Sequence, residues 1–221
     1  MDGGQTPKPM QIDFVSDVVC PWCVIGLKGL EKALDNLKGT VDATVALQPF
    51  ELNPDMPREG QNVAEHVAQK FGGQTAQLDA ARDAIKARAA EFGFTMAMRE
   101  DSRIYNSFDA HRLLHWAGLK GKGVELKLAL FGAYFTDSAN IGDADVLAAR
   151  AESVGLDPVE ARGVLTSGRY TQEVRAAEET WRRAGINSVP SVIVNRKYLI
   201  SGGQPAAAFE EALRRIAAEA A

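Results

Sequence analysis

Cysteine is scarce in this chain, and the features of a membrane or secreted protein are missing. Two of the 221 residues are cysteines, too few for the disulfide framework of a small secreted domain. No apolar stretch approaches the roughly 20 residues that a transmembrane helix needs. Residues 1–9 lack the apolar core of a secretory signal and are expected to be a disordered lead-in. From these absences we expect a cytoplasmic protein without a membrane partner.

Basic charge is also in short supply. Lysine and arginine number 25 against 29 aspartates and glutamates, which gives a formal net charge of −4 and a pI of about 5.5. The basic pairs at 182–183 and 214–215 lie among acidic residues, as on a solvated helix face. This balance argues against a nucleic-acid partner. The hydrophobic content of 46% is that of an ordinary globular protein.

The two cysteines form the motif Cys20-Pro21-Trp22-Cys23, directly after an apolar run. A Cys-x-x-Cys pair in a βαβ setting is typical of a redox pair and less often half of a metal site. Pro21 suits the first helical position, where a missing N–H costs no hydrogen bond. Cys20 then lies at the helix N-cap, where unpaired N–H groups and the helix dipole favour a thiolate. We predict that Cys20 is the attacking sulfur and Cys23 the resolving sulfur.

The pattern around this motif predicts an α/β fold with a thioredoxin-like core. Residues 11–16 have the composition of a short strand, and apolar residues recur at helical spacing up to residue 37. Residues 41–47 alternate between apolar and polar, as in a second strand. Two further strands are expected in 191–201 around a turn, followed by a last helix after residue 204. The order is βαβ … ββα.

Between the two halves of this core, the pattern is helical from about residue 62 to 184, without strand-like alternation. We therefore predict a large inserted all-helical domain. The expected boundaries are 10–57 for the first part of the thioredoxin-like core, 58–168 for the helical insertion domain and 169–221 for the second part of the core.

Three stretches, 17–23, 49–57 and 185–191, resemble the DsbA-like thioredoxin superfamily. The resemblance covers nearly the whole chain from residue 11 onward, the helical insertion included. Within that superfamily the chain is similar to the cytoplasmic FrnE-type thiol–disulfide oxidoreductases, which are related to kappa-class glutathione transferases and 2-hydroxychromene-2-carboxylate isomerases.

The resemblance implies further site residues. The Val189–Pro190 bond is expected to be cis and to lie against the active-site sulfurs, with the backbone of Val189 exposed to substrate. Pro21 and Trp22 are expected to shape the site. The relatives that bind glutathione place contacting residues at the positions of Asn53, Val189 and Gln204.

One departure separates this chain from the transferase and isomerase relatives, which carry serine at the position of Cys20 and lack a second cysteine. Two sulfurs make exchange between a dithiol and a disulfide available. We predict a thiol–disulfide oxidoreductase that acts on disulfide- or thiol-bearing proteins or on small thiols. No bound cofactor is expected; glutathione is a candidate co-substrate, and a homodimer a candidate assembly.

Other interpretations stay open at this stage. A glutathione-dependent transferase or isomerase would use Cys20 in place of the relatives' serine, and a redox sensor would oxidise the pair without turnover. A zinc site would join both cysteines to His111 and His115, but the long interval after Cys23 does not fit a zinc finger, so no metal is predicted. Asp17 is expected to be a solvated turn carboxylate rather than a proton relay for Cys23. The three histidines are expected to be ordinary helix residues.

Overall fold

A four-stranded sheet forms the centre of the molecule. The computed structural model describes residues 6–71, 75–97, 99 and 101–219. The strand order is β2-β1-β5-β6, in which β1 pairs parallel with β2 and antiparallel with β5, and β5 pairs antiparallel with β6. The strands are β1 Lys8–Ser16, β2 Val41–Pro49, β5 Ser191–Val194 and β6 Tyr198–Ser201. The βαβ unit and the hairpin predicted from the sequence are confirmed.

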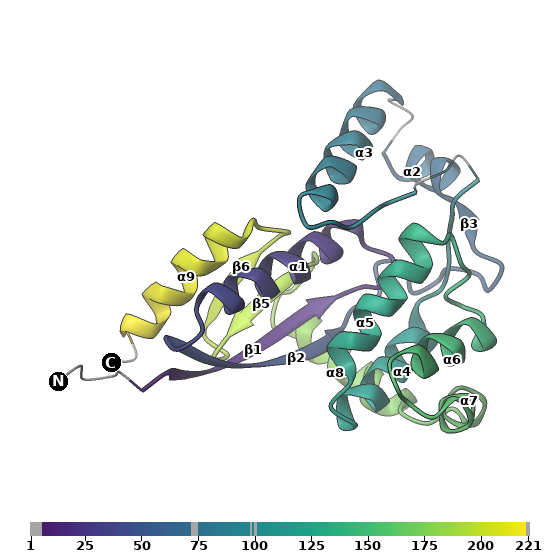
Figure 1. Cartoon of the computed structure of the whole chain (residues 1–221). Coiled ribbons are helices and arrows are strands. Elements are labelled where there is room, and N and C mark those ends of the chain that lie inside the picture. Colours follow the sequence, from purple (N-terminus) through teal and green to yellow (C-terminus); the bar gives the residue numbers. More distant parts are fainter. Residues whose placement is uncertain (1–5, 72–74, 98, 100, 220–221) are drawn as a thin grey trace.

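Helices cover both faces of this sheet (Figure 1). Ile12 and Phe14 of β1 pack against α1 and α9, whereas Val15 points to the other face, toward α8, because successive side chains of a strand alternate. The helices are α1 Pro21–Asn36, α2 Val63–Phe71, α3 Thr75–Ala90, α4 Phe108–Leu119, α5 Gly123–Phe131, α6 Ala144–Ser153, α7 Pro158–Ser167, α8 Thr171–Arg183 and α9 Ala206–Glu219, with a π-helix η1 at Gly132–Thr136. Among the described residues, none of these helices has the length and apolar character to cross a bilayer.

Two expectations about secondary structure are wrong. Lys8 and Pro9 belong to β1 and not to a disordered lead-in, because Lys8 pairs with Val41 of the neighbouring strand. The helical block is also interrupted by a small antiparallel pair, β3 Gln61–Asn62 and β4 Arg103–Ile104. Strands of two residues are too short to produce a visible alternation in a sequence.

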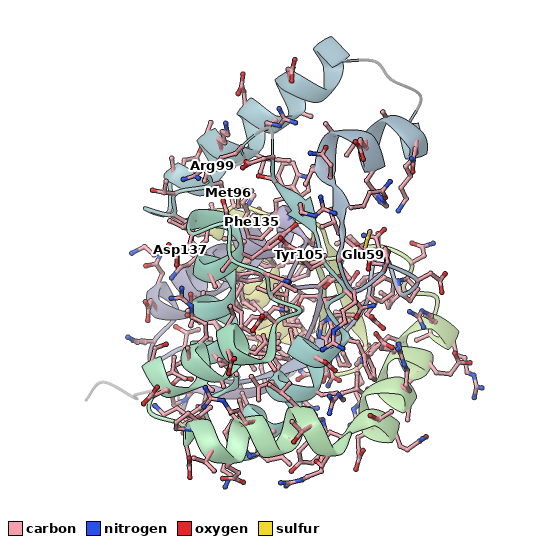
Figure 2. The ribbon with its side chains drawn as sticks, turned by 90° about the vertical axis from the view of Figure 1, so that its right-hand side faces the viewer. Glu59, Met96, Arg99, Tyr105, Phe135 and Asp137 are labelled. Atoms are coloured by element: carbon pink, nitrogen blue, oxygen red, sulfur yellow. The ribbon has the colours of Figure 1, made fainter. Side chains whose placement is uncertain are left out.

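The helical block packs on the core in two ways. Helices α4 to α7 enclose a second apolar cluster, which includes Trp116, Leu126 and Leu147 and which Val18 and Val19 join from the segment between β1 and α1. In contrast, α3 packs against α1, and Met96 and Phe135 join the cluster that contains both cysteines. Figure 2 shows Met96 and Phe135 close together, where the Ala97 N–H donates to the Phe135 carbonyl oxygen at 2.7 Å. The boundaries at residues 58 and 168 stay predictions.

Helix α1 approaches the C-terminal half of the chain closely at Gly29. A Cβ atom at this position would lie 2.5 Å from the carbonyl oxygen of Gln204. Because that oxygen belongs to the backbone, it cannot move aside as a flexible side chain would. Glycine at this position allows α1 to pack against the segment that leads into α9.

We expect Gly29→Ala to lower the free energy of unfolding by about 1–3 kcal/mol through this overlap, as measured by urea denaturation. Gly163→Ala is the matched control, because Gly163 is exposed in the interior of α7, and a methyl group added there would meet nothing within 4 Å. That control should be neutral or stabilising by up to about 1 kcal/mol. Equal stability of the two variants would contradict the packing argument.

Candidate active site

The two cysteines lie at the start of α1, at the carboxyl end of β1. Cys20 is the N-cap residue, with φ −93° and ψ 114°, and Pro21 opens the helix. The Cys23 N–H donates to the Cys20 carbonyl oxygen at 3.1 Å, so the two residues are one helical turn apart. Both are free thiols, and both are buried.

The Cys20 thiol does not contact the backbone in the way that the sequence suggests. It makes no capping hydrogen bond with the first turn of α1. Instead, its Sγ donates to the carbonyl oxygen of Val189 at 3.6 Å. The sulfur is therefore tied to the segment before β5, which is distant from α1 in the sequence.

Val189 and Pro190 form the wall opposite the cysteines. Their peptide bond is cis, the isomer that the resemblance implies. A Cβ atom on Gly26 would lie 2.8 Å from Pro190 Cγ, so the proline ring packs directly on α1. The Pro190 carbonyl oxygen accepts a hydrogen bond from Gly202 N–H at 2.8 Å, which links this wall to the loop before α9.

Trp22 is the one member of the motif that is clearly open to solvent, with 39% of its surface exposed. It packs against the loop before α9, because a Cβ atom on Gly203 would lie 2.8 Å from the Trp22 carbonyl oxygen and 3.1 Å from its ring. Gln204, the next residue, is half-buried and donates its Nε2 to the Ser201 carbonyl oxygen at 2.8 Å. An exposed indole thus borders the cysteines, beside one of the three residues expected to contact glutathione.

Asp17 is buried, and the expectation of a solvated carboxylate is wrong. Its Oδ2 accepts a hydrogen bond from Leu52 N–H at 2.8 Å, and its Oδ1 lies 3.3 Å from His111 Nε2. Burial disfavours the charge, but the hydrogen bond and charge of His111 and the Leu52 amide outweigh it and hold the pKa of Asp17 below its usual value. His111 is consequently not an ordinary helix residue either, since α4 presents it to this carboxylate.

Asp17, His111 and a buried lysine, Lys127, form a group near the two sulfurs that we call the charged floor. The sequence analysis missed the lysine. Lys127 of α5 is 1% exposed, and its Nζ lies 5.2 Å from the centre of the Phe131 ring. Burial lowers the pKa of Lys127 to about 8, and ionisation of Cys23, Asp17 or Cys20 acts in the opposite direction. Its position between Leu126 and Leu128, in a helix whose only other charged residue is Glu125 in the first turn, is the signal that could have identified it.

The same surroundings make Cys23 a weak acid. Burial raises the pKa of the Cys23 thiol well above its usual value, and the hydrogen bond and charge of Cys20 raise it further. The positive charge of Lys127 acts in the opposite direction. Cys23 is therefore protonated near neutral pH, beside a cation that favours its ionised form.

The remaining predicted residues are divided between this site and other contacts. Asn53 is half-buried, follows Leu52 in the segment that contacts Asp17, and accepts a hydrogen bond from Lys70 Nζ at 3.5 Å. The zinc alternative finds no support, because His111 faces Asp17 whereas His115 packs against the Tyr170 ring, with 4.9 Å between ring centres. Within the described ranges, no three histidine, cysteine, aspartate or glutamate residues are grouped to hold a metal ion.

The chain is similar to known proteins in both sequence and structure. The model of the DSBA-like thioredoxin domain family matches residues 11–214. The protein YwbO of Bacillus subtilis (strain 168) is 30% identical over 205 residues, which cover 92% of this chain and 96% of YwbO. The crystal structure of a probable DsbA oxidoreductase from Streptomyces coelicolor is similar with 34% identity and a TM-score of 0.87, over 93% of this chain and 89% of that chain. A 2-hydroxychromene-2-carboxylate isomerase has a similar fold, with 15% identity and a TM-score of 0.72, over 95% of this chain and 97% of that chain.

We expect Asp17→Asn to lower the free energy of unfolding by about 2 kcal/mol, because His111 loses the anion that it contacts and buried Lys127 loses a negative charge that favours its charged form. The difference in the free energy of unfolding between this variant and wild type should reach its full size at pH values above the unfolded-state pKa of Asp17, about 3.9. It should shrink as the pH falls through the lower native value, because wild type then protonates Asp17 as well. Urea denaturation at several pH values measures it.

Asp145→Asn is the control, since the Asp145 side chain is 83% exposed and its replacement should leave the unfolding midpoint almost unchanged. An Asp17→Asn midpoint equal to that of wild type at neutral pH would show that the buried charges are not coupled.

Proposed function

The chain belongs to the DsbA-like thioredoxin domain family, and from that premise we propose that it is a thiol–disulfide oxidoreductase whose redox pair is Cys20 and Cys23. One observation carries the proposal. The Cys20 thiol lies at the start of a helix, against the carbonyl oxygen of the residue before Pro190, with a second sulfur one turn away. This arrangement provides a nucleophile, a wall for an extended substrate and a resolving thiol.

The proposed reaction has two exchange steps. The Cys20 thiolate attacks one sulfur of a substrate disulfide, forms a mixed disulfide, and expels the other substrate sulfur as a thiolate that takes up a proton. Cys23 then loses its proton and attacks Cys20 Sγ, which forms the Cys20–Cys23 bond and releases the second substrate sulfur as a thiol. The substrate is reduced by two electrons and the pair is oxidised; an external dithiol or glutathione restores it. The reverse sequence oxidises a substrate dithiol.

The second step requires a charge on a buried sulfur, and Lys127 is suited to favour it. Removing the Cys23 proton in a low-dielectric site is costly without a nearby cation. Lys127 supplies that cation from α5, and Asp17 balances its charge when Cys23 is protonated. We therefore assign Lys127 and Asp17 to the ionisation of the resolving thiol, and not to contact with the substrate.

The residues around Cys20 favour a substrate that approaches as an extended segment or a small thiol. The backbone of Val189 is available next to the sulfur, and the exposed Trp22 ring offers an apolar contact. Gln204 borders Trp22 through Gly203, so glutathione is a reasonable co-substrate, and Asn53 belongs to the segment beside Asp17. Action on protein disulfides or small thiols, the cytoplasmic location and the homodimer stay predictions.

A glutathione-dependent transferase or isomerase is the alternative, and the second sulfur argues against it. Such an enzyme needs one group that activates the glutathione thiol. It has no use for a resolving cysteine with a buried cation beside it. The similarity to the isomerase, at 15% identity, concerns the fold.

We expect the protein to accelerate the reduction of insulin by dithiothreitol and the reduction of glutathione disulfide, and Cys20→Ser to fall to the uncatalysed rate. Cys23→Ser should instead accumulate a mixed disulfide on Cys20, detected by mass spectrometry, because the resolving step is lost. Equal rates for wild type and Cys20→Ser would exclude this function. Turnover of an electrophile with glutathione that survives in Cys23→Ser would favour the alternative.

We expect Lys127→Met to slow the second step, measured as release of the second substrate sulfur from the mixed disulfide in rapid-quench experiments. Loss of a cation close to an ionising group raises a thiol pKa by about 1–3 units, so resolution should slow about tenfold near neutral pH and recover at higher pH. Lys122→Met is the control, because the Lys122 side chain is 43% exposed and pairs with Glu125. A pH profile of Lys127→Met that coincides with that of Lys122→Met would contradict the role of the buried amine.

A further inference from the structure

Two completely buried carboxyl groups share one arginine next to the redox site. The side chains of Glu51 and Glu178 are both 0% exposed, and Arg175, at 44% exposure, contacts both through Nη1. Glu51 lies between β2 and the helical block, whereas Arg175 and Glu178 are one turn apart on α8. Arg175 also stacks on Phe108 at the start of α4, 3.7 Å from the ring centre to its Cζ. One cation therefore connects three separate parts of the chain.

This cluster has one carboxylate more than its cation can balance. The second oxygen of Glu51, Oε1, is buried and has no hydrogen-bond partner among the described residues. Burial and the charge of Glu178 raise the pKa of Glu51 to about 7, with Asp17 adding to the effect and Arg175 opposing it. An ionised Glu51 would leave two carboxylates to share the charge of Arg175 in a low-dielectric site, which proteins avoid by binding a proton.

The cluster holds the segment 50–53 in place through its backbone. The Glu51 N–H donates to Glu178 Oε1 at 3.1 Å, and the next amide, that of Leu52, donates to Asp17 Oδ2 at 2.8 Å. The Leu52 side chain packs against the cluster that includes Cys20 and Cys23. The consecutive amides of Glu51 and Leu52 thus connect Glu178 of α8 to the Asp17 carboxylate.

We propose that Glu51 is a positioning residue for the redox site: with its carboxyl protonated, α8 holds the segment 50–53 against Asp17, and loss of that proton releases the segment. The proposal rests on the oxidoreductase function proposed above. Asn53 follows directly in the chain, so the same proton governs the placement of a residue expected to contact glutathione.

The groups that face Glu51 explain the direction of the effect. Glu178 and Arg175 approach from α8, Asp17 from the end of β1, and His111 lies behind Asp17 on α4. A further cation of α8, Arg182, lies over the Phe50 ring at 5.5 Å. When Glu51 ionises, it repels Glu178 and Asp17 together, and the single charge of Arg175 is divided between Glu51 and Glu178. The two carboxylates that accept the segment's amides are then pushed away from it.

The free energy of unfolding also depends on the protonation of Glu51 and decreases as the pH rises. The native pKa of Glu51 is raised above its value of about 4.3 in an unfolded chain. The contribution of protonated Glu51 to the free energy of unfolding is therefore fully present below the unfolded-state pKa. It is lost as the pH rises from there through about 7. The pH range in which the segment loosens includes neutrality.

The test compares Glu51→Gln, a neutral isostere of the protonated form, with wild type in insulin reduction between about pH 6 and pH 8.5. The ratio of the two rates cancels the ionisation of the thiols, which both proteins share. We expect a ratio near one at the acidic end that rises to about threefold in favour of Glu51→Gln at the alkaline end. Glu179→Gln is the matched control on the exposed face of α8, where Glu179 pairs with Arg183, and its ratio should stay near one throughout.

Two measurements on the same proteins do not require turnover. In carboxyl-labelled glutamate NMR, one resonance should titrate near pH 7 in wild type and in Glu179→Gln, and be missing in Glu51→Gln. Arg175→Met should move that midpoint upward, because it removes the cation that favours the ionised form. Hydrogen exchange of the Leu52 amide, corrected for its intrinsic pH dependence, should accelerate about tenfold across neutrality in wild type but not in Glu51→Gln.

The outcomes separate this inference from the proposed function. Absence of insulin reduction in every variant would remove the oxidoreductase function and, with it, the positioning role. Activity with a flat ratio, or Leu52 exchange that depends on pH equally in wild type and Glu51→Gln, would overturn the role of Glu51 and leave the oxidoreductase function intact. A glutamate resonance near pH 7 that persists in Glu51→Gln would likewise overturn it.

Discussion

The buried carboxylate of Asp17 is the interaction on which the rest of the site depends. It follows directly on β1, three positions before Cys20, and it accepts the Leu52 amide and contacts His111. A buried carboxylate stays ionised only where donors and cations surround it. The segment after β2 and helix α4 therefore each present a partner to Asp17, and Lys127 of α5 adds a buried positive charge to the same region. The need to stabilise the charge of Asp17 therefore links the core that carries the sulfurs to the helical block.

Because these groups are close together and buried, a change in the charge of one alters the protonation of the others. Ionisation of either cysteine adds a negative charge to a region that already holds Asp17, which in turn acts on the adjoining Glu51. Lys127 and Glu51 have pKa values of about 8 and about 7, so both can exchange a proton near neutrality. Ionisation of the two sulfurs is consequently coupled to proton exchange at Lys127 and Glu51.

The sequence predicted what depends on local patterns. The strands and helix around Cys20, the hairpin before α9, and the placement of the cysteine at an N-cap all follow from spacing and composition over a few residues. The charged floor could not be predicted in this way, because its contacts join residues far apart in the chain: 35 positions for Asp17 and Leu52, 94 for Asp17 and His111, and 124 for Glu51 and Arg175. Charged residues are rarely buried, so the sequence favours a solvated Asp17. The apolar residues on either side of Lys127 and of Glu51 are the local signal that these two side chains are buried.

The order of strands also has a consequence for biosynthesis. The central strand β1 meets β2 soon after it is made, but its other neighbour, β5, belongs to the last part of the chain. Cys20 and Val189 are 169 positions apart, and a ribosome that adds about 5–20 residues per second needs on the order of ten seconds to cover that interval. During that time the nascent chain carries two thiols without the wall that later covers them. The two thiols are therefore most exposed to oxidants during translation, before β5 and the segment that carries Val189 are in place.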